Sequence, residues 1–442
     1  MRIGYKLLSL LQKSMAIKHL EIYNFGPIKE VKLDFSRVNV FIGPQSAGKS
    51  CILKIACHCA WVEKRLMVSK DITFFQKNNY FFEQLLDFHK LQGYDTNPDL
   101  RIVYKTTFLT LEYVHANKQF TCKFTNQGRF YKRAKLSYIP AERNVIATVP
   151  NWMELSYEET NTRSFMADWA ESRKEFVGKH LSILSLGAEY YYDEKQDKDM
   201  VKFDNLENGL PMSNISSGLQ SLIPIMLYVH YLTRIVFNEK SESFIKTRDN
   251  VNLMYRMYKT ALKKSDSEKN IKQSYDLKLN NEFLSFSSEK ERNDFLQRYN
   301  NYTRYQHSDI FLEEPEENLF PKTQAEVIFH LLQEIFSSER ENSLYLATHS
   351  PYVLYALNNA ILANIIKKDD LQLSMFKYAD VKFKASDISV WQIKNGSIER
   401  IENNPSNTIQ DKSGLIRQNY FDSVMKEVMT DFNNMLSYRK YE

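Results

Sequence analysis

Residues 38–50, VNVFIGPQSAGKS, decide the fold that this sequence predicts. The run Val38–Ile42 is apolar at nearly every position, which is typical of a strand buried on both faces. A Gly-x-x-x-x-Gly-Lys-Ser pattern follows at once at 43–50, and apolar residues at helical spacing come after it. A strand, a glycine-bounded loop and a helix in this order predict an α/β fold of the P-loop NTPase class.

The loop itself predicts a nucleotide site. Its backbone N–H groups are expected to surround phosphates, with Lys49 at the β and γ phosphates and Ser50 as a ligand of Mg²⁺. The helix behind the loop directs its positive N-terminus at the same place. The predicted nucleotide-binding residues are Gly43, Pro44, Gln45, Ser46, Ala47, Gly48, Lys49, Ser50 and Cys51.

A second motif, DIFLEEPEENLFP at 309–321, places two carboxylates at the tip of another apolar run. Glu313 is predicted to be a partner of Mg²⁺, either as a direct ligand or through a group that is itself bound to the ion. Glu314 is predicted to be the general base, or the group that orients the attacking water. A charged loop after a strand is the alternative that the residues alone leave open.

Two further segments complete the set. In SLYLATHSPYVL, 343–354, His349 follows a third apolar run and is interpreted as a γ-phosphate sensor, a structural histidine being the alternative. In NISSGLQSLIPI, 214–225, Ser217 opens an apolar helix. It is either an N-cap or part of an anion site at a helix N-terminus.

These motifs, in the order GPQSAGKS, SSGLQ, FLEEPEENLFP and THSP, resemble the ABC-type ATPases of the SMC and RecF kind. They resemble more closely the OLD-like ATPases of bacterial anti-phage systems, such as the PARIS, Septu and retron-associated ones. The resemblance covers residues 16–400 and implies an ATPase head with an antiparallel β subdomain. It also implies two heads that sandwich two ATP molecules, so that Ser217 acts on the partner's nucleotide and Asn318–Pro321 link the two sites.

The sequence departs from this pattern at three places. Leu219 stands where transporter-type members carry a second glycine, and Glu313 stands where many members carry Asp. The glutamine that links the two lobes in the family has no clear counterpart. Glu142 and Arg143, at a predicted strand tip, and Gln76 are the candidates.

The layout follows from composition and alternation. Residues 17–42 predict three strands of a small antiparallel sheet, 100–139 predict further strands, 188–209 and 390–401 predict hairpins, and 415–438 predict an amphipathic helix. We expect an N-terminal arm at 1–14, an ATPase domain at 15–231 and 306–442, and a helical insertion at 232–305. That insertion lacks glycine and proline and carries 15 Lys and Arg against 10 Asp and Glu. It is either a solvated surface or a docking surface for an acidic partner or nucleic acid.

Bulk properties narrow the classes of function. No apolar run reaches the roughly 18 residues that span a bilayer, so we expect no membrane association and a cytoplasmic protein. The net charge of +5 is too small to identify a nucleic-acid-binding protein. The cysteines, Cys51, Cys57, Cys59 and Cys122, are interpreted as reduced core thiols, with a metal cluster as the alternative.

The sequence therefore predicts an ATP-hydrolysing subunit of a bacterial anti-phage system, dimeric or a higher homo-oligomer, that controls a separate effector such as a nuclease. Only 93 residues follow His349 here, and we expect the ATPase domain to need them, so any cleavage of nucleic acid is expected from another polypeptide rather than from a nuclease domain of the OLD type. The alternatives are a RecF-like DNA-binding repair ATPase and an ATP-gated scaffold with negligible turnover.

Overall fold

One large mixed sheet organises the part of the chain that the computed structural model describes, residues 18–149, 152, 159–238, 252–258, 275–279, 282–366, 380–399 and 407–439. Its order is β6-β5-β4-β1-β2-β17-β16-β3-β15-β14-β7. The strands are β1 (Lys18–Phe25), β2 (Ile28–Phe35), β3 (Val38–Ile42), β4 (Arg101–Thr106), β5 (Leu109–Val114), β6 (Gln119–Phe124), β7 (Ala134–Ile139), β14 (His307–Glu313), β15 (Ser343–Ala347), β16 (Ile388–Lys394) and β17 (Ser397–Ile398).

The half of the sheet from β16 to β7 is parallel throughout. The register sets Glu313 of β14 beside Ala347 of β15, and Ile42 of β3 beside Gln392 of β16. The carboxyl ends of these strands therefore meet at one edge of the sheet, where ligands bind in open α/β sheets. This edge carries the loop after β3 and the carboxylates of Glu313, the last residue of β14, and Glu314, the residue after it.

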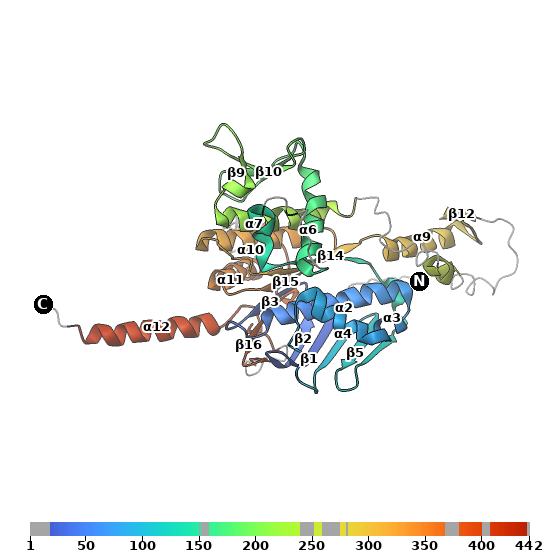
Figure 1. Cartoon of the computed structure of the whole chain (residues 1–442), viewed down its shortest axis with the longest axis horizontal. Helices are drawn as coiled ribbons and strands as arrows, with labels where there is room; N and C mark the ends of the chain where they lie inside the picture. The colour runs from blue at the N-terminus through green and yellow to red at the C-terminus, as the bar shows by residue number, and fades with distance from the viewer. Residues whose placement is uncertain are drawn as a thin grey trace.

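Helices cover both faces of the parallel half (Figure 1). In β3, Val38, Val40 and Ile42 pack in one core cluster, whereas Phe41 packs in the other, as the alternation of a strand requires. The first cluster includes side chains of α6 (Asn161–Ser172), α7 (Ser217–His230), α10 (Pro321–Phe336) and α11 (Pro351–Ile365). The second includes α2 (Lys49–Ser69) and α4 (Tyr80–His89). The predicted α/β fold is confirmed.

The antiparallel half contains β6, β5, β4, β1 and β2, and the β16–β17 hairpin joins it to the parallel half. This hairpin was predicted from its Asn395-Gly396 turn, and both turn residues have positive φ, 52° and 80°. One prediction was wrong: β3 does not belong to the antiparallel strands but lies between β15 and β16. The reason is that β3 is buried at every position, which suits the centre of a parallel sheet.

Aromatic residues of 100–139 pack in the hydrophobic core. Tyr104, Tyr113 and Phe120 are at most 2% exposed, in agreement with their interpretation as packing residues rather than base-stacking ones. A second, four-stranded sheet includes the predicted hairpin β9 (Ala188–Asp193) and β10 (Lys198–Phe203). The remaining short elements are α3 (Thr73–Gln76), α5 (Val145–Thr148), β8 (Leu181–Ser182), β11 (Leu210–Pro211), the 3₁₀ turns 77–79, 128–130, 141–144, 173–176, 212–214 and 385–387, and a π-helical turn at 231–235.

The insertion at 232–305 is not purely helical. Residues 252–258 and α9 (Glu289–Thr303) are helical, but β12 (Tyr275–Leu279) and β13 (Glu282–Phe286) form an antiparallel pair. The prediction of a helical hairpin was wrong here. Tyr275, Leu277 and Leu279 alternate with charged residues along β12, and Leu284 and Phe286 of β13 are buried together, so this local pattern outweighs the absence of glycine and proline.

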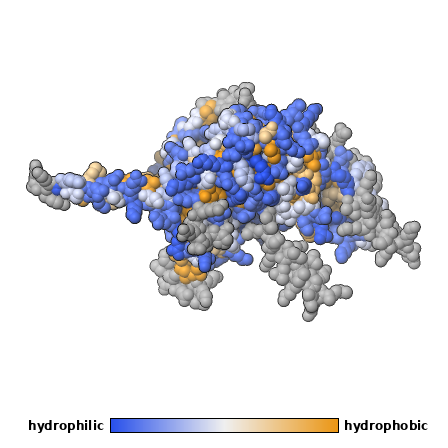
Figure 2. All heavy atoms as spheres, turned by 90° about the horizontal axis from the view of Figure 1, so that it is seen from below, coloured by the Kyte–Doolittle hydropathy of each residue, from blue (hydrophilic) through white to orange (hydrophobic). Residues whose placement is uncertain are grey.

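The two ends of the chain differ in what is described. The predicted arm at 1–14 lies outside the described residues. The predicted C-terminal helix is α12 (Tyr420–Ser437), which begins with a capping box of Asn419 and Asp422 and projects from the body (Figures 1 and 2). None of its own residues is buried, and Met425, Phe432 and Met435 are more than half exposed. Among the described residues, no helix is long and apolar enough to cross a bilayer.

Candidate nucleotide-binding site

The loop 43–50 has the backbone that its glycines require. Gly43 and Gly48 have φ of 144° and 101°, in the region that disfavours side chains. A Cβ on Gly43 would stand 2.1 Å from the carbonyl oxygen of Ile393, and one on Gly48 would stand 2.7 Å from the side chain of Ile28. The neighbouring chain thus holds the loop tightly, and α2 begins directly behind it at Lys49 without a side-chain cap. The first N–H groups of α2 are therefore available to an anion.

Lys49 lies inside this loop. Its Nζ donates hydrogen bonds to the carbonyl oxygens of Gly43 at 2.9 Å and Pro44 at 2.7 Å, and the residue is 4% exposed. Burial lowers the pKa of Lys49 to about 8, although the charges of Glu314 and Glu316 oppose that shift. A lysine that has lost water and donates its hydrogen bonds to carbonyl oxygens gains a strong partner when a phosphate approaches.

Glu313 ends β14 and is buried. Its Oε1 accepts a hydrogen bond from the Tyr138 hydroxyl at 2.5 Å, and its Oε2 accepts one from the Ala141 N–H at 3.3 Å. Burial raises the pKa of the Cys51 thiol to about 11, and the charge of Glu313 contributes, so this carboxylate lies near the first turn of α2. A carboxylate there and the Ser50 hydroxyl are oxygen donors of the kind that Mg²⁺ prefers, so the residues fit that ion.

Glu314 adopts a left-handed backbone, φ 43°, which is uncommon for a residue with a side chain. Its N–H donates to the carbonyl oxygen of Ala347, 2.8 Å away, so the neighbouring strand holds it in place. Its side chain is 40% exposed, and Oε1 lies 3.8 Å from Nε2 of His349. Burial, followed by the charge of Glu313, raises the pKa of Glu314, whereas Arg143 and Lys49 lower it. An accessible carboxylate with a raised pKa suits a general base.

His349 is held by a residue that the sequence did not single out. Glu316 accepts a hydrogen bond from the His349 N–H at 2.5 Å through Oε1, and one from the Thr348 hydroxyl at 2.8 Å through Oε2. Burial, together with the positive charge of Lys49, lowers the pKa of His349. The motif contains four glutamates, and only the fold distinguishes Glu316 from its neighbours.

Ser217 lies at the first position of α7 and is exposed. The next residue, Gly218, packs so closely that a Cβ there would stand 2.8 Å from the carbonyl oxygen of Asn318. The amide of Asn318 also donates to the Ser221 hydroxyl at 3.1 Å. The structure thus brings the start of α7 together with the loop that follows the two glutamates, while Lys49, Glu313, Glu314 and His349 gather at the loop 43–50.

The candidates for the lobe-linking residue differ in their distance from the two glutamates. Gln76 donates to the carbonyl oxygen of Phe120 in β6, at the edge of the sheet opposite to β7 and β14. Arg143 follows β7 and is fully buried. It donates to the carbonyl oxygens of Glu313 at 3.0 Å and Glu314 at 2.8 Å. Tyr138 therefore contacts the predicted Mg²⁺ partner Glu313, and Arg143 contacts the backbone of Glu313 and of the predicted base Glu314; no local pattern in the sequence reveals these contacts.

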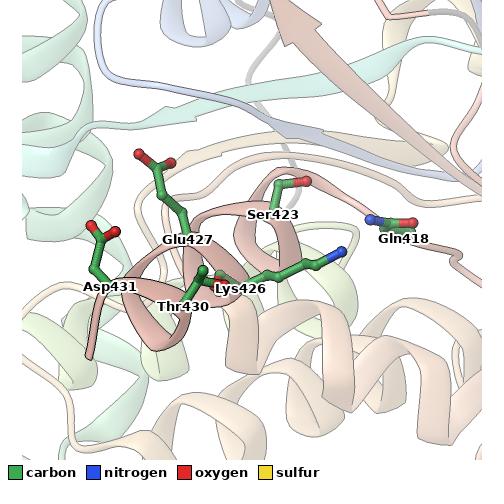
Figure 3. Close-up of a pocket in the computed structure, with 6 residues that line it drawn as sticks. All are labelled: Gln418, Ser423, Lys426, Glu427, Thr430 and Asp431. Atoms are coloured by element: carbon green, nitrogen blue, oxygen red, sulfur yellow. The ribbon is translucent and has the colours of Figure 1, made fainter. Parts of the chain in front are cut away.

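Other polar features lie elsewhere. Cys51, Cys57 and Cys59 are buried free thiols, which fits their interpretation as core residues, and Cys122 is half-buried. A hollow of about 320 Å³ lies along α12, lined by polar side chains (Figure 3): Gln418, Ser423, Lys426, Glu427, Thr430 and Asp431. None of them belongs to the four motifs, so this hollow is not the predicted nucleotide site.

Comparison with known proteins gives weak structural likenesses. No protein-family model matches the chain, and no curated protein matches it. The SMC head domain from Thermotoga maritima is similar with 11% identity over 88% of this chain and 100% of that one, at a TM-score of 0.37. A recombination mediator protein RecF with ATP is similar with 12% identity over 87% and 97%, at 0.28. An ATP-binding cassette of an ABC transporter in its ADP conformation is similar with 11% identity over 88% and 91%, at 0.25. These TM-scores are too low to indicate a function, so only the residues of the site do so.

Proposed function

We propose that this chain binds ATP with Mg²⁺ and hydrolyses it. The observation that carries the proposal is the convergence of Lys49, Glu313, Glu314 and His349 at one edge of the parallel sheet, around a loop bounded by Gly43 and Gly48 with positive φ. Bound Mg²⁺ would neutralise charge on the β and γ phosphates, and Ser50 and Glu313 would hold it.

The residues then have distinct roles. Glu314 takes a proton from a water molecule whose oxygen attacks the γ phosphorus, and the bond to the β-phosphate oxygen breaks to release ADP and phosphate. Lys49 compensates the negative charge of the β and γ phosphates. His349 lies 3.8 Å from Glu314, near enough to orient the γ phosphate beside that carboxylate.

The chain acts as a dimer in this proposal, with Ser217 of one protomer completing the nucleotide site of the other. Support comes from the exposure of Ser217 and from the packing of Gly218 on Asn318, which lies four residues after Glu314. A ligand that bridges two protomers would therefore contact both the start of α7 and the loop Asn318–Pro321.

The cellular role proposed is that of an ATPase subunit in a bacterial anti-phage system, located in the cytoplasm, that controls a separate effector such as a nuclease. Its support is the resemblance of the four motifs to OLD-like ATPases. We propose residues 15–231 and 306–442 as the ATPase domain and 232–305 as its insertion. The excess of basic residues in 232–305 favours a second candidate, a RecF-like DNA-binding ATPase.

The Glu314→Gln variant tests the catalytic proposal. It should bind ATP as tightly as the unmodified protein and release phosphate at least about a hundredfold more slowly, because the amide cannot accept the proton of the attacking water. It should also accumulate as an ATP-bound dimer in light scattering. Undiminished phosphate release would exclude Glu314 as the base, and the same phenotype from Glu313→Gln alone would exchange the two assignments.

A further inference from the structure

The buried cation Arg143 connects three segments that the proposed reaction uses separately. It lies in the 3₁₀ turn Ala141–Asn144, directly after β7, which pairs with β14. Its Nε donates to the carbonyl oxygen of Ser221 in α7 at 2.9 Å, and its Nη1 and Nη2 donate to those of Glu313 and Glu314. One guanidinium therefore ties the helix that begins with Ser217 to the backbone of both glutamates.

Burying the charge of Arg143 costs free energy unless other groups compensate it. Arg143 is 0% exposed, and burial lowers its pKa, but a guanidinium keeps its proton in proteins. A buried charge persists only where partners compensate it, and here the partners are backbone carbonyl oxygens together with the carboxylate of Glu317, 3.5 Å away. The fork geometry of arginine lets one side chain reach all three segments, which an ammonium group cannot reproduce.

The hydrogen bonds of Arg143 also hold the backbone of Glu314. Glu314 has a left-handed backbone, and its peptide is held on one side by Ala347 and on the other by Arg143. Arg143 thus joins the carbonyl oxygen of Ser221 in α7 to the carbonyl oxygen of Glu314 through one side chain. A second link runs in parallel, from Ser221 to Asn318.

We propose that Arg143 is a positioning residue that couples the placement of α7 to the carboxylate of Glu314. Engagement of Ser217 by a nucleotide would then align the general base of the same chain, so that hydrolysis waits until the second protomer is in place. This inference rests on the proposed ATPase function and adds the internal connection between its two halves.

The test compares Arg143→Lys with Arg37→Lys. Arg37 is a control because its guanidinium also donates to several backbone carbonyl oxygens, those of Asn342, Ile335 and Arg340, although this side chain is only partly buried. It lies directly before β3, at the end of the strand remote from the loop 43–50. Both variants keep a positive charge but lose the planar guanidinium with its several donors. A difference between them therefore reports the place of Arg143 beside Glu314, not the general contribution of an arginine to folding.

We expect Arg143→Lys to lower kcat by about ten- to a hundredfold while the Kd for ATP stays within about twofold, since small misplacement of a catalytic group carries such a cost. Arg37→Lys should leave both values within about twofold. An Arg143→Lys protein with unchanged kcat would overturn the inference. So would a parallel fall of kcat, ATP affinity and thermal midpoint, because that pattern describes a structural role alone.

A double-mutant cycle tests the coupling itself. If the effect of Ser217 passes through Arg143, Ser217→Ala combined with Arg143→Lys should turn over no more slowly than the slower single variant. Fully multiplicative losses would show that the two residues act independently and would overturn the coupling. An unmodified protein that binds ATP without releasing phosphate would instead overturn the proposed function, so the two failures are distinguishable.

Discussion

Proton uptake on nucleotide binding should report directly on Lys49. In the structure its Nζ faces the carbonyl oxygens of Gly43 and Pro44, and burial lowers its pKa to about 8. The phosphates of a nucleotide would place negative charge beside it and raise that pKa toward its ordinary value of 10.5 or above. The complex then holds more protons than the free protein, so binding takes up protons and weakens as the pH rises.

The magnitude follows from the lowered pKa. With a pKa of about 8, Lys49 is about one-tenth neutral at pH 7, half neutral at pH 8 and nine-tenths neutral at pH 9. Binding should therefore take up about 0.1, 0.5 and 0.9 proton at these pH values. The affinity should fall about tenfold from pH 7 to pH 9, which is about 1.4 kcal/mol.

The assay is isothermal titration calorimetry with Mg²⁺ and ADP, which is not hydrolysed, in two buffers of different ionisation enthalpy at each pH. Lys64→Met is the control: Lys64 lies on the same helix, α2, and burial lowers its pKa to about 7. The control should keep the proton uptake, whereas equal heats in both buffers and a constant affinity from pH 7 to pH 9 would refute the placement of Lys49.

Three further outcomes are expected. Tyr138→Phe removes the hydroxyl that holds Glu313 and should raise the Mg²⁺ concentration for half-maximal activity about tenfold; an unchanged Mg²⁺ dependence would contradict the metal assignment. Gly43→Ala should cost at least about 3 kcal/mol of unfolding free energy in urea because its Cβ would overlap a backbone carbonyl. Gly93→Ala, with positive φ but nothing within 4 Å, should cost only about 1 kcal/mol, and equal losses would count against the clash. Removing residues 424–442 should change stability by less than about 0.5 kcal/mol because no side chain of α12 is buried; a large fall of the thermal midpoint would show that α12 packs on the body.

The motifs could be found from the sequence because each is local. A buried strand followed by a polar tip predicts where a side chain lies in an α/β sheet, and the loop 43–50, Glu314 and His349 all meet that condition. The Asn-Gly pair at 395–396 likewise predicts a tight hairpin turn, and both residues have the positive φ that such a turn needs.

The partners of these residues could not be found in the same way. Tyr138 and Glu313 are 175 positions apart, and Arg143 reaches Glu314 across 171, so their contacts depend on β7 and β14 pairing in register. The strands β12 and β13 were missed for a different reason. The absence of glycine and proline from 232–305 favours helices, and this signal concealed the spacing of apolar residues that favours strands. β3 was placed in the wrong half because three consecutive strands suggest a meander, whereas burial on both faces requires flanking parallel strands.

The central claim, an ATP site shared between two protomers, is tested by mixing two inactive variants. Lys49→Ala removes the cation of the loop 43–50, and Ser217→Arg replaces an exposed hydroxyl at the start of α7 with a bulky cation. If Ser217 acts on the partner's nucleotide, a mixed dimer combines both lesions in one site and leaves the other intact. If one intact site can turn over alone, an equal mixture should recover up to about one quarter of the unmodified rate of phosphate release, as expected for random pairing in a twofold dimer. No recovery, with mixed dimers shown to form, would mean either that Ser217 acts within its own chain or that the two sites are strictly coupled, because the intact site takes Glu314 from the chain whose Ser217 is replaced. Disulfide crosslinking between cysteines placed near Ser46 of one protomer and Gly218 of the other then decides: the crosslink is expected, and its absence would contradict the shared site.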